Sequence, residues 1–283
     1  MSTITLTEDT APSRTRRASD VGIHRKERPV GFGATLQAEW IKIRTVRSTI
    51  WTLISLIALS VGVTALSAAT AAPGLADGSQ PDPLGAFLTV GLSFGQVAAL
   101  VLGVLVISGE YGTGTVRSSI AAVPHRGRLV AAKALVLGSI LLVFGTATAF
   151  AGFYAANLFF NAEGIGASLS DDGVLRAMFG GGLYLAVLGI FAMGIGLMVR
   201  HTAGALTLSI ALIFVLGNVT MLLPGSLGEW TTKLMPGNAG GSVAQVAPFG
   251  LDLLDPWVGF AVFVGQAALL LLVGTWLFRR RDA

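Results

Sequence analysis

Residues 91–95 form a G-x-S-x-G sequence, in which Ser93 is the potential nucleophile of a serine hydrolase. Such a serine needs a histidine base within hydrogen-bonding distance. The candidates are His24, His125 and His201. All three are predicted at the inner side of the membrane, whereas Ser93 lies about 20 Å from that side along its own helix. The spacing therefore excludes a serine protease, and the two glycines of the motif indicate close helix packing.

Other catalytic chemistries are also excluded by the residues present. The chain has 0 cysteines, so thiolate metal sites, disulfides and cysteine nucleophiles are impossible. It contains no H-E-x-x-H zinc motif and no Gly-Lys pair, and a phosphate-binding loop of the G-x-x-x-x-G-K-[ST] type requires that pair. The chain is therefore not predicted to be an enzyme and cannot hydrolyse ATP by that route.

The composition indicates a membrane protein. Of 283 residues, 53% are hydrophobic and only 12% are charged, whereas soluble domains average about 25% charged residues. The mean hydropathy is +0.74. These values exclude a disordered chain and a typical soluble enzyme.

Six segments are apolar and long enough to cross a bilayer, which takes about 20 residues in a helix. Backbone groups in lipid must be satisfied within the segment, so each is predicted to be a helix. The predicted spans are about 50–72, 84–107, 134–158, 177–199, 202–223 and 256–278. The fold class is therefore an all-α polytopic membrane protein. The uncharged window Leu234–Leu251 contains prolines and several glycines, which favour an interfacial or re-entrant loop over a seventh span.

Positive charge sets the predicted topology. Of the 19 Lys and Arg residues, all but Arg176 and Lys233 fall on the side that holds both ends of the chain. Because Lys and Arg mark cytoplasmic loops, both termini are predicted in the cytoplasm. In the fourth span, glycines at 180–182, 189, 194 and 196 predict close approach to neighbouring helices of the same chain.

Three regions follow from this pattern. Residues 1–31 are polar and predict a disordered cytoplasmic tail. Residues 32–47 form a basic amphipathic pattern with Trp40, which predicts a helix lying in the membrane surface. Residues 48–283 form the six-helix transmembrane domain.

The loop between the second and third spans, 108–133, is the one internal cytoplasmic loop long enough to present structure. Glycines permit a turn after Glu110, Thr115 can cap a short helix that runs to Val123, and Pro124 ends it. On physical grounds alone the loop is either a docking surface or a cluster of topology-setting charge.

The residues of this loop carry a family resemblance. Glu110, the pair 114–115, Pro124, Arg126 and Lys133 resemble the Glu…Gly-Thr…Pro…Arg…Lys pattern of ABC-2 type exporter permeases. The segment Ala38–Thr49 also resembles the start of bacterial members, and the resemblance covers about 36–281. It implies a transmembrane permease subunit of an ATP-driven exporter.

The resemblance also implies site residues and partners. The residues implied to couple to an ATP-binding subunit are Glu110, Gly114, Thr115, Arg117, Ile120, Pro124, Arg126 and Lys133. The residues implied for a connecting helix before the first span are Leu36, Trp40, Ile43, Arg44 and Arg47. The implied partners are a separate ATP-binding subunit, a second permease chain and membrane lipid, with no nucleic acid. No cofactor or metal is expected on this chain, since ATP and Mg²⁺ belong to the partner.

Two alternatives stay open. An ion-coupled secondary transporter usually places charged residues at mid-membrane, but the predicted spans offer only polar groups such as Gln96, Asn157, Asn218 and Gln266. A non-transporting membrane immunity or scaffold protein would need no ATPase. The low charge of the spans favours a hydrophobic or amphipathic substrate, and the excess of Arg over Lys indicates a bacterial plasma membrane.

Overall fold

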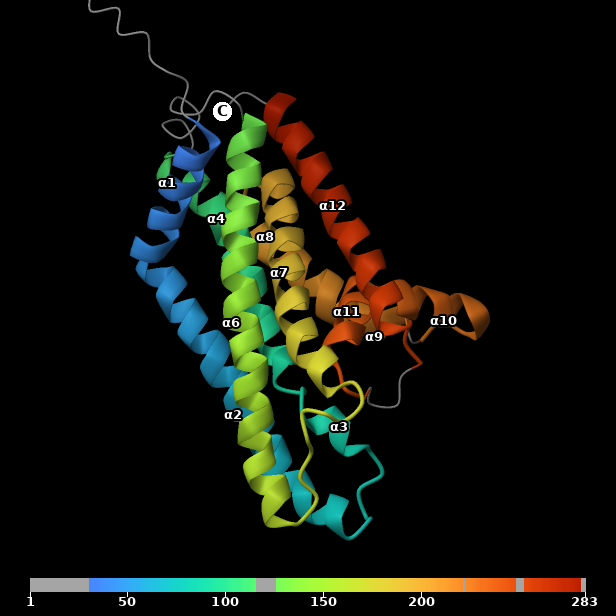
Figure 1. The fold of residues 1–283 in the computed structure, drawn as a ribbon. Helices are drawn as coiled ribbons and strands as arrows, with labels where there is room; N and C mark the ends of the chain where they lie inside the picture. Colours follow the sequence, from blue (N-terminus) through green and yellow to red (C-terminus); the bar gives the residue numbers. More distant parts are fainter. Residues whose placement is uncertain (1–30, 116–125, 221, 248–251, 281–283) are drawn as a thin grey trace, which may run out of the picture.

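The computed structural model describes residues 31–115, 126–220, 222–247 and 252–280, and the described part is an all-α bundle without strands (Figure 1). Six of its helical segments are long and apolar enough to cross a membrane, which confirms the predicted fold class. The elements are α1 (Phe32–Thr45), α2 (Arg47–Ala76), α3 (Leu84–Phe87), α4 (Leu92–Thr113), α6 (Arg126–Ala162), α7 (Val174–Val199), α8 (Thr202–Ile210), η1 (Ala211–Val215), α9 (Leu216–Thr220), α10 (Gly225–Leu234), α11 (Pro236–Gly241), η2 (Ser242–Ala244) and α12 (Pro256–Arg280).

The third and fifth spans differ in detail from the pattern of uncharged residues. Helix α6 begins at Arg126, well before the uncharged run, so Lys133 lies inside the helix. The fifth span consists of α8 and α9 joined by the π-helical turn η1, in which the Leu216 N–H donates to the Ala211 carbonyl. A search for uncharged runs therefore underestimates the length of a helix whose first turns carry charged residues.

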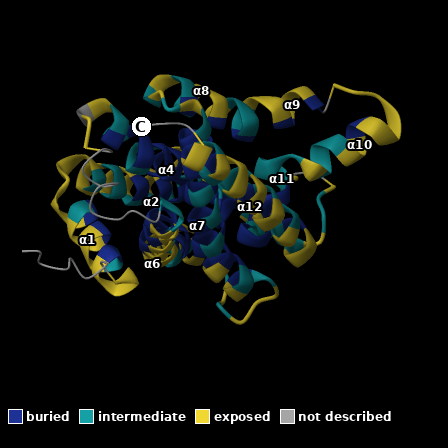
Figure 2. Cartoon of the chain, turned by 90° about the horizontal axis from the view of Figure 1, so that it is seen from above, coloured by how far each residue is buried: buried dark blue, intermediate teal, exposed yellow. Residues whose placement is uncertain are grey.

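Helix α7 is the centre of the bundle. It packs against α4, α6 and α12, and 72% of its most apolar window is buried. In Figure 2 it is mostly dark blue, whereas the outer sides of the surrounding helices are exposed. The exposed sides are apolar, as expected for surfaces that face lipid.

The glycines of α7 allow this close packing, as predicted. A Cβ on Gly182 would overlap Thr146 and Leu142 of α6, and one on Gly180 would overlap the backbone of Val243 in η2. Because the clashing atoms include backbone, no rotamer change relieves them. These contacts lie within the chain, so the small residues serve its own core.

Both chain ends of the described bundle lie at the same end of the molecule (Figure 1). There the Arg126 guanidinium donates to the carbonyl of Phe278 at 2.8 Å, joining the start of α6 to the end of α12. Most of the Lys and Arg residues lie towards that end in the sequence pattern. Its assignment to the cytoplasm rests on this distribution and stays a prediction. The in-plane orientation of α1 also stays a prediction.

The segment after the fifth span turns back into the bundle. Helix α10 projects away from it (Figure 1), whereas α11 and η2 pack between α7 and α12. Ala239 and Val243 are fully buried there. The prolines and glycines of this region thus form short helices that do not cross the membrane.

Replacing Gly182 by alanine tests the packing of α6 on α7. We expect a loss of about 1–3 kcal/mol of stability, because the added methyl group overpacks the interface. Thermal unfolding of the detergent-solubilised chain measures it. Gly265→Ala on α12, where a Cβ meets no atom within 4 Å, is the control. Equal midpoints for the two variants would contradict the close approach.

Candidate functional site

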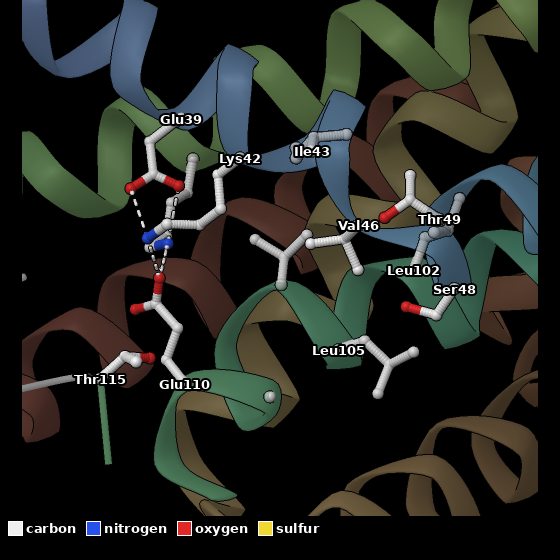
Figure 3. Close-up of a pocket in the computed structure, with 13 residues that line it drawn as sticks. Glu39, Lys42, Ile43, Val46, Ser48, Thr49, Leu102, Leu105, Glu110 and Thr115 are labelled. Carbon is white, nitrogen blue, oxygen red and sulfur yellow. Dashed lines mark hydrogen bonds and ion pairs between the residues drawn. The ribbon is translucent and has the colours of Figure 1, made fainter. Parts of the chain in front are cut away.

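Four charged side chains from three helices form one ion network (Figure 3). The Lys133 ammonium of α6 lies 2.8 Å from Glu39 Oε2 of α1 and 2.6 Å from Glu110 Oε1 of α4. The Lys42 ammonium lies 2.5 Å from the same Glu110 oxygen and 3.5 Å from Glu39 Oε1. Two ammonium groups thus face two carboxylates, and the cluster has no net formal charge.

Three of the four side chains in the network are shielded from solvent. The side-chain exposure is 2% for Lys133, 4% for Glu39 and 10% for Glu110, whereas that of Lys42 is 41%. Ions this deeply buried need partners, since an isolated buried charge costs several kcal/mol. The three buried members therefore hold each other in place, and Lys42 closes the network on its open side.

Helix α1 directs a polar face inward. Its buried residues are Thr35, Glu39 and Ile43, spaced four apart and hence on one side of the helix. Trp40, which the sequence pattern places on the apolar face, is 44% exposed. The inward side of α1 therefore combines the apolar Ile43 with the carboxylate of Glu39, which lies within ion-pair distance of Lys133 on α6.

Helices α4 and α6 bring their network residues together from the two ends of the loop between them. Glu110 lies in the last turn of α4, which ends in a left-handed residue at Gly114, with φ of 71°. Lys133 lies two turns into α6. The end of α4 and the start of α6 are therefore held together by the ion pair between Glu110 and Lys133.

Lys42 keeps its charge across the neutral pH range. Burial by itself lowers the pKa of Lys42, but the hydrogen bonds and charges of Glu110 and Glu39 outweigh it, so the pKa is raised above its ordinary 10.5. A raised lysine pKa means that the stabilisation is fully present below pH 10.5 and is lost only as the pH rises through the raised value. The Lys42 ammonium therefore contributes the same charge to the network throughout the neutral pH range.

A cavity of about 380 Å³ adjoins the network between α1, the start of α2 and the C-terminal half of α4. Figure 3 shows Val46, Leu102 and Leu105 around it, with Lys42 and Glu110 at one end. Helix α1 packs its Ile43 and Leu36 against α6, so α1 is joined to α4 across this space mainly by ion pairs. Beyond the cavity, Val46 interrupts the helix between α1 and α2 with an extended conformation.

The structure places the other sequence-predicted residues around this site. Thr115 lines the cavity, and Arg126 binds the end of α12 and stacks over the Phe278 ring at 5.7 Å. Arg44 and Arg47 are exposed. Three predicted coupling residues lie outside the described residues: Arg117, Ile120 and Pro124.

Sequence reasoning missed Glu39 and Lys42 as site residues. They lie 94 and 68 positions from their partners Lys133 and Glu110, so no local spacing could reveal the pairs. One available signal was that Glu39 and Lys42 are charged residues close to a membrane span. Charged residues in such positions of membrane proteins usually pair with an opposite charge. Within the described ranges no three His, Cys, Asp or Glu side chains gather to hold a metal.

Removing the central ammonium tests the energetics of the network. Lys133→Met is expected to cost about 3–5 kcal/mol, because two buried carboxylates lose their shared partner. Lys42→Met is expected to cost less than about 1 kcal/mol, since this ammonium is partly solvated and surface-like. Urea or thermal unfolding in detergent measures both. Equal losses for the two variants would show that Lys133 is not the centre of the cluster.

Comparison with known proteins agrees with this arrangement of helices. Residues 35–218 match the family described as ABC-2 family transporter protein. The match starts within α1 and ends within α9, so it includes the four members of the ion network. A search of curated proteins finds no match to the chain. The family match covers more than half of the sequence, and this chain therefore belongs to the ABC-2 transporter family.

Proposed function

We propose that this chain is one half of the membrane pathway of an ATP-driven exporter in a bacterial plasma membrane. Membership of the ABC-2 family makes it a membrane permease of an ABC-type transporter, and the family associates with an ATP-binding subunit. The distribution of Lys and Arg supports a topology with both termini in the cytoplasm. Export, the bacterial membrane and a second permease chain are the finer parts of the proposal.

The ion network is the observation that carries the proposed mechanism. It joins α1 to the end of α4 and the start of α6, the two helices that flank the coupling segment predicted from the sequence. Separating any of these helices would leave a buried charge unpaired, which costs several kcal/mol. A push on the loop or on α1 therefore moves the three helices together rather than bending one of them.

The mechanism uses this unit as a lever. The partner subunit supplies the energy of ATP binding and hydrolysis, and its motion reaches this chain through the loop and α1. The interruption at Val46 gives α1 a hinge to α2, and the adjoining cavity leaves room for α1 to move against α4. The network residues carry this motion into α4 and α6, whose outer ends then open a path for the substrate.

The substrate class follows from the surfaces of the spans. The exposed sides of α2, α4 and α12 are apolar, and within the described ranges the Asp, Glu, Lys and Arg residues of the spans lie near helix ends. These features support a hydrophobic or amphipathic substrate. The pathway is completed by a second permease chain and bordered by lipid.

Removing the two charges that α1 contributes to the network tests whether the network transmits motion between the helices. In the double variant Glu39→Gln, Lys42→Met, the buried pair of Glu110 and Lys133 keeps its charge balance, so the bundle is expected to fold. The complex purified from the native host with its ATP-binding subunit is labelled at a single cysteine, Val97→Cys on α4. In the wild-type network, ATP and vanadate should change the maleimide labelling rate; in the double variant, the change should be lost.

A second ion pair far from the network provides the control. Lys233→Met, Asp252→Asn removes the exposed outer pair and should leave the nucleotide-dependent labelling intact. Persistence of the response in the Glu39, Lys42 variant would contradict the lever. Absence of an ATP-binding subunit from the purified complex, together with solute movement driven by an ion gradient alone, would contradict the proposed function.

The topology is tested by single cysteines, because the chain contains 0 native ones. Ser79→Cys, in the loop after α2, should react with a membrane-impermeant maleimide added to intact cells. Gln37→Cys, on the exposed side of α1, should react only after the cells are permeabilised. The reverse pattern would invert the assignment of the two ends.

A further inference from the structure

A second cavity lies near the opposite end of the bundle. It has a volume of about 200 Å³ and lies between α4, the π-helical turn η1 with α9, and the segment of α11 and η2. Along α4 it is about 25 Å from Glu110, at 1.5 Å per residue. The ion network and its proposed lever therefore do not explain it.

The polar groups of this cavity are all neutral. They are Ser93 and Gln96 of α4, Asn218 of α9, Asn238 of α11 and Gln245 after η2. Asn218 and Asn238 use their amide N–H groups on the carbonyls of Phe214, at 2.6 Å, and Thr232, at 2.9 Å. These side chains offer hydroxyl, amide N–H and amide carbonyl groups, with no ionised group among the lining residues.

Three of the polar side chains have no partner within the described part of the chain. No hydrogen bond joins the side chain of Ser93, Gln96 or Gln245 to another described group, although the Ser93 backbone N–H donates to the Val90 carbonyl. Each of the three side chains borders the cavity. Unpaired polar groups inside a membrane-spanning bundle are unfavourable, because lipid offers no hydrogen bonds. Three of them around one cavity indicate that something polar fills it in the working protein.

The backbone around the cavity is shaped to leave this space. The π-helical turn η1 contributes Phe214, and such turns are enriched at functional sites. Gly217 and Gly241 also line the cavity, and a Cβ on either would meet its nearest neighbour, an amide nitrogen, only at 3.7 Å. Packing therefore does not require glycine at these two positions, unlike at Gly182, and a side chain larger than alanine would project into the open space.

The cavity opens onto an apolar surface. Ser93 and Asn218 are exposed, and the side chains beside them, Phe94 and Val219, are 49% and 50% exposed. A ligand that enters here must pass an apolar rim and then meet neutral donors and acceptors. The volume of the cavity is below the roughly 300 Å³ of a pocket that encloses a drug-sized ligand. The cavity would therefore hold only part of a larger molecule.

We propose that this cavity binds the neutral amide groups of a hydrophobic peptide-like molecule, which would be the cargo. The inference deepens the proposed export function and rests on it. The side-chain amides of Gln96, Gln245 and Asn218 pair with the ligand. Their N–H groups donate to peptide C=O groups, and their C=O groups accept from peptide N–H groups. The apolar rim accommodates the side chains of the ligand. Charged groups are rejected, because no opposite charge is present to offset their desolvation.

The test uses the full chain in nanodiscs, without an ATP-binding subunit. Ser93→Cys gives a single reporter at the cavity, and its rate of reaction with a neutral maleimide is measured. The probe is N-acetyl-leucyl-leucine amide, a blocked and uncharged dipeptide. It should slow the reaction in a saturable way, whereas its N-methylated analogue, which lacks the backbone donors, and the cationic leucyl-leucine amide should protect far less.

Two variants connect the protection to the cavity itself. Gln96→Leu should weaken protection about tenfold, the effect of losing one hydrogen bond of about 1.4 kcal/mol. Gly217→Leu should fill the cavity and slow labelling without any probe. Gly265→Leu, at an open position on α12 away from the cavity, should alter neither result. A variant that does not purify as a monodisperse chain is replaced by Gln245→Leu, for which the same weakening is expected.

Several results would overturn the proposal. Equal protection by the N-methylated analogue would make the cavity an apolar lipid site. Stronger protection by octyl glucoside would assign it to sugars, and no saturable protection by any probe would leave it a water-filled space. Because no ATP-binding subunit is present, these results are independent of the nucleotide-dependent labelling that tests export. If the dipeptide protects Ser93→Cys but nucleotide does not change the labelling of Val97→Cys, the result would support the binding site and contradict the export function.

Discussion

The buried ammonium of Lys133 is the constraint on which the end of the bundle that holds both chain ends depends. A charge with 2% side-chain exposure persists only where opposite charges surround it. Here those charges come from two other helices, and so the position of α1, the end of α4 and the start of α6 are fixed together. The interaction is a costly way to gain stability, since apolar side chains would pack there more simply. What it provides is a specific pairing of three helices that apolar packing in lipid does not enforce.

The rest of the bundle is held by close contact rather than by charge. Helix α7 places glycines against α6, α12 and the short helices that return from the outer side. Lipid weakens the driving force for burying apolar groups, so close backbone approach and van der Waals contact hold spanning helices together. The centre is therefore tightly packed, whereas the two cavities lie towards the inner and outer ends, beside α4. Helix α4 lines both, which makes it the structural link between the two ends.

Much of this architecture follows directly from the sequence, but the site follows only in part. The spans, the exclusion of Leu234–Leu251 as a span and the packing role of the glycines near 180–182 were all predicted, because each depends on local composition. Glu110 and Lys133 were selected from the loop pattern, but their direct contact was not. Glu39 and Lys42 were missed, since their partners Lys133 and Glu110 lie 94 and 68 positions away in the sequence. The structure divides the apolar stripe of this helix: Ile43 is buried, whereas Trp40 is 44% exposed.

The sequence by itself determined what kind of molecule this is: apolar runs of spanning length require helices, and positive charge biases their orientation. Only the tertiary structure decided which charges meet and which polar groups are left to face a cavity. The reason is physical. Hydropathy and helix formation are properties of neighbouring residues, whereas an ion pair between positions 39 and 133, or a cavity between α4, η1 and α11, exists only after helices distant in sequence have packed.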